Sequence, residues 1–275
     1  MAFPTATTAT SQQSTNSATR TVTLPVGVAA GDLVIALIAG DGTTTFTWPS
    51  PWVEIKDEAG SGFVFTAAYL IASGGETSVA VTASAVERSN HIALRITGWH
   101  GTTPPEIAAA ATGSSTTPNP PSLTPSWGAA DTLWIAIAAA DDSATPFPIT
   151  AWPANYTTNQ IANATATSAA DVAIATRGLN AAAEDPGTFT MTGTETWNAY
   201  TIAVRPAAET AISGTDSGAA SDTASAPAVA LTSIDSGAGI EAAASLGNVT
   251  ATLARRVTHI RAPSRWLIGI DTMGR

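Results

Sequence analysis

The segment Leu33–Ala39 is an unbroken run of seven apolar residues, with Gly31-Asp32 before it and Gly40-Asp41-Gly42 after it. Val34 and Ile35 are β-branched, and the flanking turn residues leave too little length for a stable helix. The run therefore predicts a β-strand that is buried on both faces, or the inner strand of a sandwich.

The same pattern returns at 130–142, where Asp131 stands in the place of Asp32 and another apolar run follows. Other strand-like segments recur in matching order: Ala67–Ala72 as Val172–Arg177, Thr77–Thr82 as Gly187–Thr192, and Ile92–Thr97 as Ala199–Val204. The chain is therefore predicted to contain an internal duplication, approximately 21–101 and 122–205.

Helical periodicity is nowhere sustained, so the fold class is predicted to be all-β. Four to six strands in each half cannot easily bury both of their faces alone. We therefore expect one jelly-roll-like β-sandwich of two pseudo-repeats over residues 1–206, with two tandem small β-domains as the alternative. Residues 1–20 are rich in Thr, Ser, Ala and Gln and predict an N-terminal arm or an edge strand, before a first strand at Arg20–Leu24.

The chain has 11 Lys and Arg against 21 Asp and Glu, a formal charge of −10, which argues against non-specific nucleic-acid binding. It has no Cys, which excludes disulfides and thiolate metal sites. The N-terminus has no signal-peptide pattern, and no apolar run reaches the length of a membrane-spanning helix, so no membrane partner is expected. Charged residues make up only 12% of the chain, a surface that suits packing in a large assembly or work outside the cell.

No residue set predicts catalysis, a cofactor or a metal site. His91, His100 and His259 lack metal-ligand spacing, and His91 and His100 are expected to be structural or incidental. The adjacent acids Asp57-Glu58 and Asp141-Asp142 would point to opposite faces of a strand, so neither pair is expected to form a catalytic dyad. The protein is therefore predicted not to be an enzyme; a glycan-degrading enzyme is the least favoured alternative.

The tryptophans suggest a binding role and a structural role. Trp134 lies inside an apolar run and is expected in the core, whereas Trp127 and four others lie in loops beside Pro, Gly or Ser. Loop tryptophans can stack on sugars or anchor an interface, and they can also cover the end of a sandwich. The candidate glycan contacts are Trp48, Trp52, Trp99 and Trp152.

The composition changes after Pro206. In residues 207–254 the Asp-Ser-Gly-Ala pattern of 216–219 recurs at 235–238, which favours a repeated extended β-unit, with a low-complexity linker as the alternative. Residues 255–275 hold five arginines and one acid, and are predicted to be a basic β tail for docking or oligomerisation. The residues expected to make the assembly contacts are Arg256, Arg261, Arg265, Trp266, Leu267, Ile268 and Ile270.

Several of these motifs together resemble virion structural proteins of tailed bacteriophages, of the capsid decoration or minor tail type. The motifs are the Gly31–Ala36 strand, the Trp/Pro loop Phe46–Trp52, Ala72–Glu76, the Asp-Ser-Gly-Ala repeats and the unit Arg256–Arg265. The resemblance implies a non-enzymatic component of the virion that assembles with copies of itself, with threefold symmetry if the tails intertwine, and with other virion proteins. It implies no catalytic residues. A carbohydrate-binding adhesin that reads host glycans through its loop tryptophans is the alternative.

Overall fold

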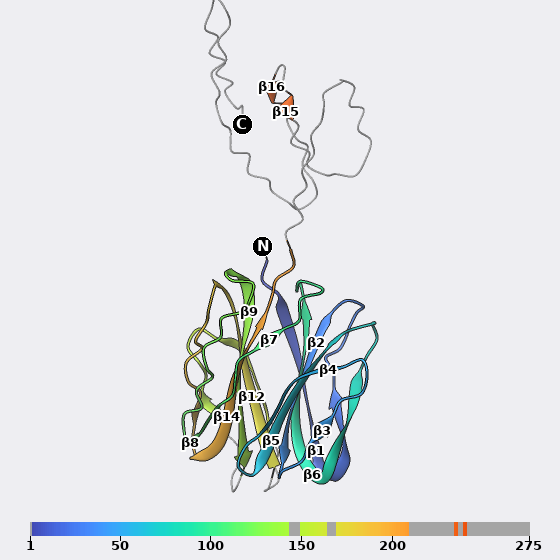
Figure 1. Ribbon diagram of the computed structural model, residues 1–275, viewed down its shortest axis with the longest axis vertical. Coiled ribbons are helices and arrows are strands. Elements are labelled where there is room, and N and C mark those ends of the chain that lie inside the picture. Colours follow the sequence, from blue (N-terminus) through green and yellow to red (C-terminus); the bar gives the residue numbers. More distant parts are fainter. Residues whose placement is uncertain (1, 143–148, 164–168, 209–233, 236–238, 241–275) are drawn as a thin grey trace, which may run out of the picture. The chain divides into compact units, whose positions relative to one another are not determined.

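The computed structural model describes residues 2–142, 149–163, 169–208, 234–235 and 239–240 (Figure 1). The chain divides into two compact units, Met1–Glu209 and Thr210–Arg275. We call the first unit the head. The predicted repeat region and basic tail lie almost wholly outside the described residues; only the short antiparallel pair β15 (Ile234–Asp235) and β16 (Gly239–Ile240) is described there.

The head is all-β, as predicted, and the described residues contain no helix. The N-terminal half supplies β1 (Thr5–Thr23), β2 (Leu33–Asp41), β3 (Phe46–Thr47), β4 (Val53–Ala59), β5 (Phe63–Ile71) and β6 (Ser78–Thr97). The C-terminal half supplies β7 (Glu106–Ile107), β8 (Ala111–Ser115), β9 (Ala130–Asp142), β10 (Ile149–Ala151), β11 (Thr157–Ala162), β12 (Ala169–Ala181), β13 (Thr190–Met191) and β14 (Glu195–Val204). Within the described part of the chain there is accordingly no helix that is long and apolar enough to cross a membrane.

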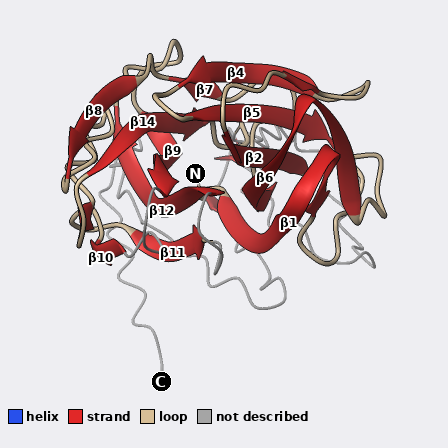
Figure 2. Ribbon diagram, turned by 90° about the horizontal axis from the view of Figure 1, so that it is seen from below, coloured by secondary structure: helices blue, strands red, loops and turns tan. Residues whose placement is uncertain are grey.

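The strands form two antiparallel sheets that pack against each other as a β-sandwich (Figure 2). The N-terminal sheet has the order β1-β6-β2-β5-β4, with β3 beside β6, and the C-terminal sheet has the order β11-β12-β9-β14-β7, with β8 beside β14. Strands β10 and β13 form a separate small sheet. The sandwich that the sequence predicts is confirmed.

The two apolar runs that dominate the sequence lie on the central strands β2 and β9. Alternate residues of each run face the other sheet, because successive side chains of a strand point to opposite faces. The core between the sheets contains Leu33, Ile35, Leu37, Phe65, Ile92, Leu94, Leu133, Ile135, Ile137, Ile174, Tyr200 and Ile202, all at most 4% exposed. The intervening residues are also buried, which explains why both runs are continuous and not alternating.

The outer face of each sheet is covered by its own half of the chain. Strands β1 and β6 are long and irregular in register, and their paired ends, Arg20–Thr23 with Ser78–Val81, return over the outer face of the N-terminal sheet. Val22 and Val81 pack there against residues such as Val34. In the other half, a cluster that includes Trp134, Phe189 and Met191 covers the corresponding face. Each half therefore has a small core of its own and shares a larger one.

The two sheets have the same strand order, since β6, β2, β5 and β4 correspond to β14, β9, β12 and β11. The packing also relates them: β1 lies against β11, and β4 lies against β7. The structure corrects the sequence alignment, in which Asp131 took the place of Asp32 and Thr132 that of Leu33. Leu33 and Leu133 are the residues that face the core between the sheets, and they pair with Ile96 and Val204. Ile96 thus corresponds to Val204 and not to Ala203, and a shift of one residue exchanges the two faces of a strand.

The N-terminal segment is an edge strand, the second of the two forms expected for it. Residues 5–13 pair along β6, and the Thr8 hydroxyl donates to Gln160 Oε1 of the opposite sheet at 3.2 Å. A buried polar contact also joins the two sheets. Asn90 Nδ2 donates to Asp171 Oδ1 at 2.7 Å and to the Ala170 carbonyl at 3.0 Å. Such contacts fix the relative position of two otherwise apolar surfaces.

Candidate functional site

Most loop tryptophans lie over the ends and outer faces of the sheets. Trp134 is fully buried, as expected for a core residue. Trp48 and Trp52 stack at a centroid distance of 5.5 Å and pack on the outer core of the N-terminal sheet. Trp152 packs edge-on against Phe189 at 5.8 Å, on the other side of the head. The structure therefore brings Trp48 and Trp52 together and places Trp152 elsewhere, and all three rings are half-buried.

The prediction that Trp99 is the fourth glycan contact is corrected by its burial. Only 6% of the residue is exposed, and its indole Nε1–H donates to the Gly31 carbonyl at 2.9 Å. Its ring belongs to the core between the sheets and has no free face on which a sugar could stack. Sequence reasoning could not detect this, because the Gly-Trp-His-Gly context of Trp99 is typical of a loop.

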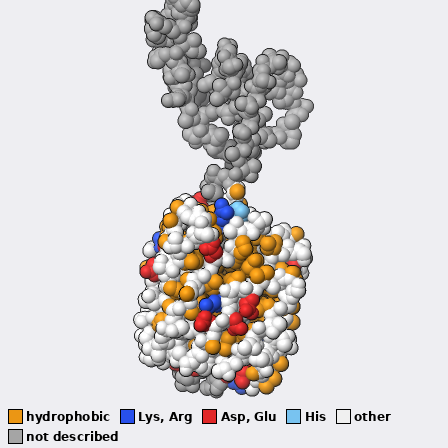
Figure 3. All heavy atoms as spheres, viewed as in Figure 1, with side chains coloured by type: hydrophobic (Ala, Val, Ile, Leu, Met, Phe, Trp, Pro, Cys, Tyr) orange, Lys and Arg blue, Asp and Glu red, His pale blue; other side chains and the backbone are white. Residues whose placement is uncertain are grey.

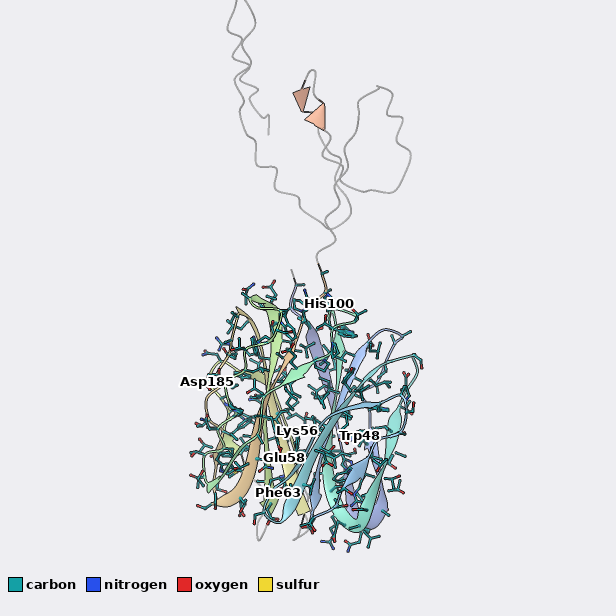
Figure 4. The ribbon with its side chains drawn as sticks, viewed as in Figure 1. Trp48, Lys56, Glu58, Phe63, His100 and Asp185 are labelled. Atoms are coloured by element: carbon teal, nitrogen blue, oxygen red, sulfur yellow. The ribbon has the colours of Figure 1, made fainter. Side chains whose placement is uncertain are left out.

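Glu54, Asp57 and Glu58 form a charged group with Lys56 on β4, and Figure 4 labels Lys56 and Glu58. Lys56 Nζ lies 2.8 Å from Glu58 Oε2 and 5.6 Å from the ring centroid of Tyr200. Burial and the neighbouring Asp57 raise the pKa of Glu54, and burial and Glu58 raise the pKa of Asp57. The group is crowded with like charge, and Lys56 pairs with one of its acids, Glu58.

His91 is a buried structural residue. Its Nδ1 lies 3.1 Å from Ser11 Oγ, and its Nε2 lies 2.8 Å from Ser89 Oγ. Burial, followed by the charge of Arg20, lowers the pKa of His91 to about 3. Arg20 is itself buried, with its guanidinium carbon 5.8 Å from the Phe46 ring centroid. Neutral His91 therefore fills a polar gap between β1 and β6.

His100 lines a pocket at the end of the head that holds residues 205–208 (Figure 4). We call it the end pocket; its volume is about 230 Å³, and its walls include His100, Trp127, Ala130, Arg205 and Pro206. Figure 3 shows a basic side chain and a histidine side by side at this end of the head.

Backbone pairing brings the two halves together at the end pocket. Trp99 and Pro206 form an isolated antiparallel bridge, the His100 N–H donates to the Arg205 carbonyl at 2.9 Å, and the Ala207 N–H donates to the Gly98 carbonyl at 2.9 Å. The residues that follow β14 are therefore held against the end of β6, and Arg205 is placed beside His100.

Thr103 links the two polar side chains of the end pocket. Its hydroxyl lies 2.8 Å from His100 Nδ1, and its backbone N–H donates to the same nitrogen at 3.2 Å. Arg205 Nη1 donates to the Thr103 hydroxyl at 3.3 Å. Thr103 thus contacts both the guanidinium and the imidazole, and the Thr102 hydroxyl lies 3.3 Å from the same Nδ1.

A second hollow of about 330 Å³ lies between the edge strands β1 and β11, lined by neutral residues that include Thr10, Gln12, Asn90 and Asn163. Across the residues that the structure describes, no group of three or more His, Asp or Glu side chains could hold a metal ion. The predicted assembly residues, Arg256 to Ile270, lie outside the described residues, so their role stays a prediction.

Comparison with protein-family models, with curated proteins and with solved structures finds no match to this chain. The evidence for a binding site is therefore the geometry of the end pocket. Sequence reasoning missed Thr103 and Arg205, which are separated by about half the head, and named Trp127 only as one loop tryptophan among several. The Pro-rich loop beside Thr103 and the arginine that follows β14 are weak signals in the sequence. Only the bridge between Trp99 and Pro206 shows that these two segments meet.

Proposed function

We propose that this protein is a non-enzymatic structural component of a tailed-bacteriophage virion, a capsid decoration or minor tail protein. In this proposal the β-sandwich head is attached through the C-terminal segment, which assembles with other copies of the chain or docks on the particle. The sequence motifs that resemble phage virion proteins suggest the virion, and the geometry of the head supports attachment through its C-terminal end.

The observation that carries the proposal is the way in which the chain leaves the head. Strand β14 is an inner strand of the C-terminal sheet, and the residues after it are held by the backbone bonds of His100 and Ala207. Tension on residue 208 would therefore act on a strand that pairs on both sides, because β14 lies between β9 and β7 with β8. An attachment point of this kind suits a head that is held by the segment following it.

The charge distribution supports the same role. Residues 255–275 carry five arginines and Asp271, a charge of +4, whereas the whole chain carries −10. Arginine forms bidentate pairs with carboxylates, so a basic segment can join acidic surfaces of neighbouring copies or of the particle. Trp266, Leu267, Ile268 and Ile270 add the apolar side chains that anchor interfaces.

Deletion of residues 255–275 tests the proposal. The shortened chain is expected to keep the circular dichroism and melting temperature of the head, and to lose oligomerisation and incorporation into particles. Multi-angle light scattering and a particle-binding assay measure both effects. A matched variant, Trp266→Ala in the full chain, is expected to weaken association by about 2–4 kcal/mol. A shortened chain that keeps its oligomeric state and still joins the particle would refute the role of this segment.

A further inference from the structure

Arg205 differs from the other solvent-accessible arginines whose contacts the structure gives. Arg95 Nε lies 2.5 Å from Asp32 Oδ2, and Arg177 Nη1 lies 2.8 Å from Glu184 Oε1. Within residues 2–142, 149–163 and 169–208, Arg205 has no carboxylate partner and donates a single bond, to Thr103. A guanidinium has five N–H donors, so most of its hydrogen-bonding capacity faces the end pocket and solvent.

The hydrogen bonds of His100 assign its proton. Nδ1 receives the backbone N–H of Thr103, so it acts as an acceptor, and in the neutral ring the proton then resides on Nε2. The Thr103 hydroxyl also lies 2.8 Å from this Nδ1, and it accepts a hydrogen bond from Arg205. Within the described residues Nε2 has no hydrogen-bond partner, and because His100 lines the end pocket, its N–H can donate to a ligand there.

The rest of the pocket lining is apolar. Trp127 is half-buried against the outer core of the C-terminal sheet, and its Nε1–H donates to Thr132 Oγ1 at 3.2 Å. Ala130 and Pro206, both buried, complete this wall. A volume of about 230 Å³ is below the usual 300–1,000 Å³ of pockets for drug-sized ligands, so the end pocket fits one small ring and not an extended chain.

We propose that the end pocket binds a single sugar ring that carries a carboxylate, a uronic acid, with the carboxylate on Arg205 and His100 Nε2 and the ring against Trp127. The fork of a guanidinium matches a carboxylate in a bidentate pair, and a second donor at Nε2 favours an oxyanion over a neutral hydroxyl. An indole offers an apolar face with one polar edge, and here that edge is already bonded to Thr132. This site differs from the four tryptophans expected from the sequence, and it does not depend on the assembly role.

The test uses the full chain and two probes that differ only in charge, methyl β-glucuronide and methyl β-glucoside. Titrations followed by NMR of the Trp127 indole N–H and the His100 ring protons measure both affinities. The glucuronide is expected to shift these signals and to bind at least about tenfold more tightly than the glucoside, because only the glucuronide pairs with Arg205. Equal affinity for both probes, or no shift at these signals, would overturn the proposal.

Three variants assign the contact. Arg205→Gln is expected to lower the glucuronide affinity at least about tenfold, and Arg205→Lys to lower it less, because lysine keeps the charge and loses the fork. The control, Lys56→Gln on β4, removes the same charge elsewhere and is expected to leave the affinity unchanged. An equal loss in Lys56→Gln would show a non-specific charge effect and refute the site. Competition by inorganic phosphate at the same concentration as glucuronide would also refute it, by showing a general anion site.

Discussion

The pH dependence of stability is expected to report on His91 directly. Its imidazole is fully buried between Ser11 and Ser89, and burial and the charge of Arg20 lower its pKa from 6.5 to about 3. In the unfolded chain the same group has its ordinary pKa of 6.5. Between these two values the unfolded chain binds a proton that the folded head does not.

The sign of the effect follows from this difference. Above about pH 6.5 both states are neutral at His91, and its contribution to stability is complete. As the pH falls below this value, protons bind to the unfolded chain, and the free energy of unfolding falls by about 1.4 kcal/mol per pH unit. Between about pH 6.5 and about pH 3 the free energy of unfolding falls by a total on the order of 5 kcal/mol through His91. About 3 kcal/mol of this fall has occurred by about pH 4.5.

Urea unfolding of the protein and of His91→Gln, at about pH 7.5 and about pH 4.5, measures this contribution. The difference in unfolding free energy between the two proteins is expected to change by about 3 kcal/mol between the two pH values, in favour of the variant at acid pH. Other acids whose pKa is shifted, including Glu54 and Asp57, are present in both proteins and cancel in the subtraction.

Ser89→Ala is the control, because it removes the hydroxyl at 2.8 Å from Nε2 and leaves the titrating group in place. Its cost is expected to be about 1 kcal/mol at both pH values, since folded His91 stays neutral in both. If the difference between the protein and His91→Gln is the same at about pH 7.5 and about pH 4.5, the account of a neutral buried imidazole is refuted.

Two further predictions concern the core between the sheets. Ile35→Ala and Ile135→Ala, both at fully buried positions of the central strands, are each expected to cost about 2–5 kcal/mol by urea unfolding, whereas Val26→Ala, at 93% exposure, should cost less than about 0.5 kcal/mol. Costs below about 1 kcal/mol at both core positions would contradict the central placement. Residues 1–102 and 103–206, expressed separately, are each expected to be insoluble or molten, because each would expose its side of the shared core. Two soluble halves with cooperative thermal transitions would contradict this single-sandwich interpretation.

The strands of the core were predictable because their signal is local. Leu33–Ala39 and Leu133–Ala140 are apolar at every position, and a strand that is covered on both faces requires this pattern. The β-branched residues and the Gly/Asp residues at the ends add local preferences that agree with the fold. For the same reason the all-β class followed from the sequence.

The register between the repeats was not predictable to one residue. Ala, Ile and Val are acceptable on either face of a strand that is buried on both sides, so an alignment displaced by one residue scores nearly as well. Only the pairing of Leu33 with Ile96, and of Leu133 with Val204, decides which residues face the other sheet.

The tertiary structure alone decided the role of individual tryptophans and the existence of the end pocket. Trp48 and Trp99 have similar loop contexts in the sequence, yet Trp99 enters the shared core and Trp48 packs on an outer face. His100 and Arg205 are distant in the chain and become neighbours through one backbone bridge after β14. Local preference determines which segments become strands, whereas burial and the meeting of distant side chains depend on how those strands pack, and this information is not local.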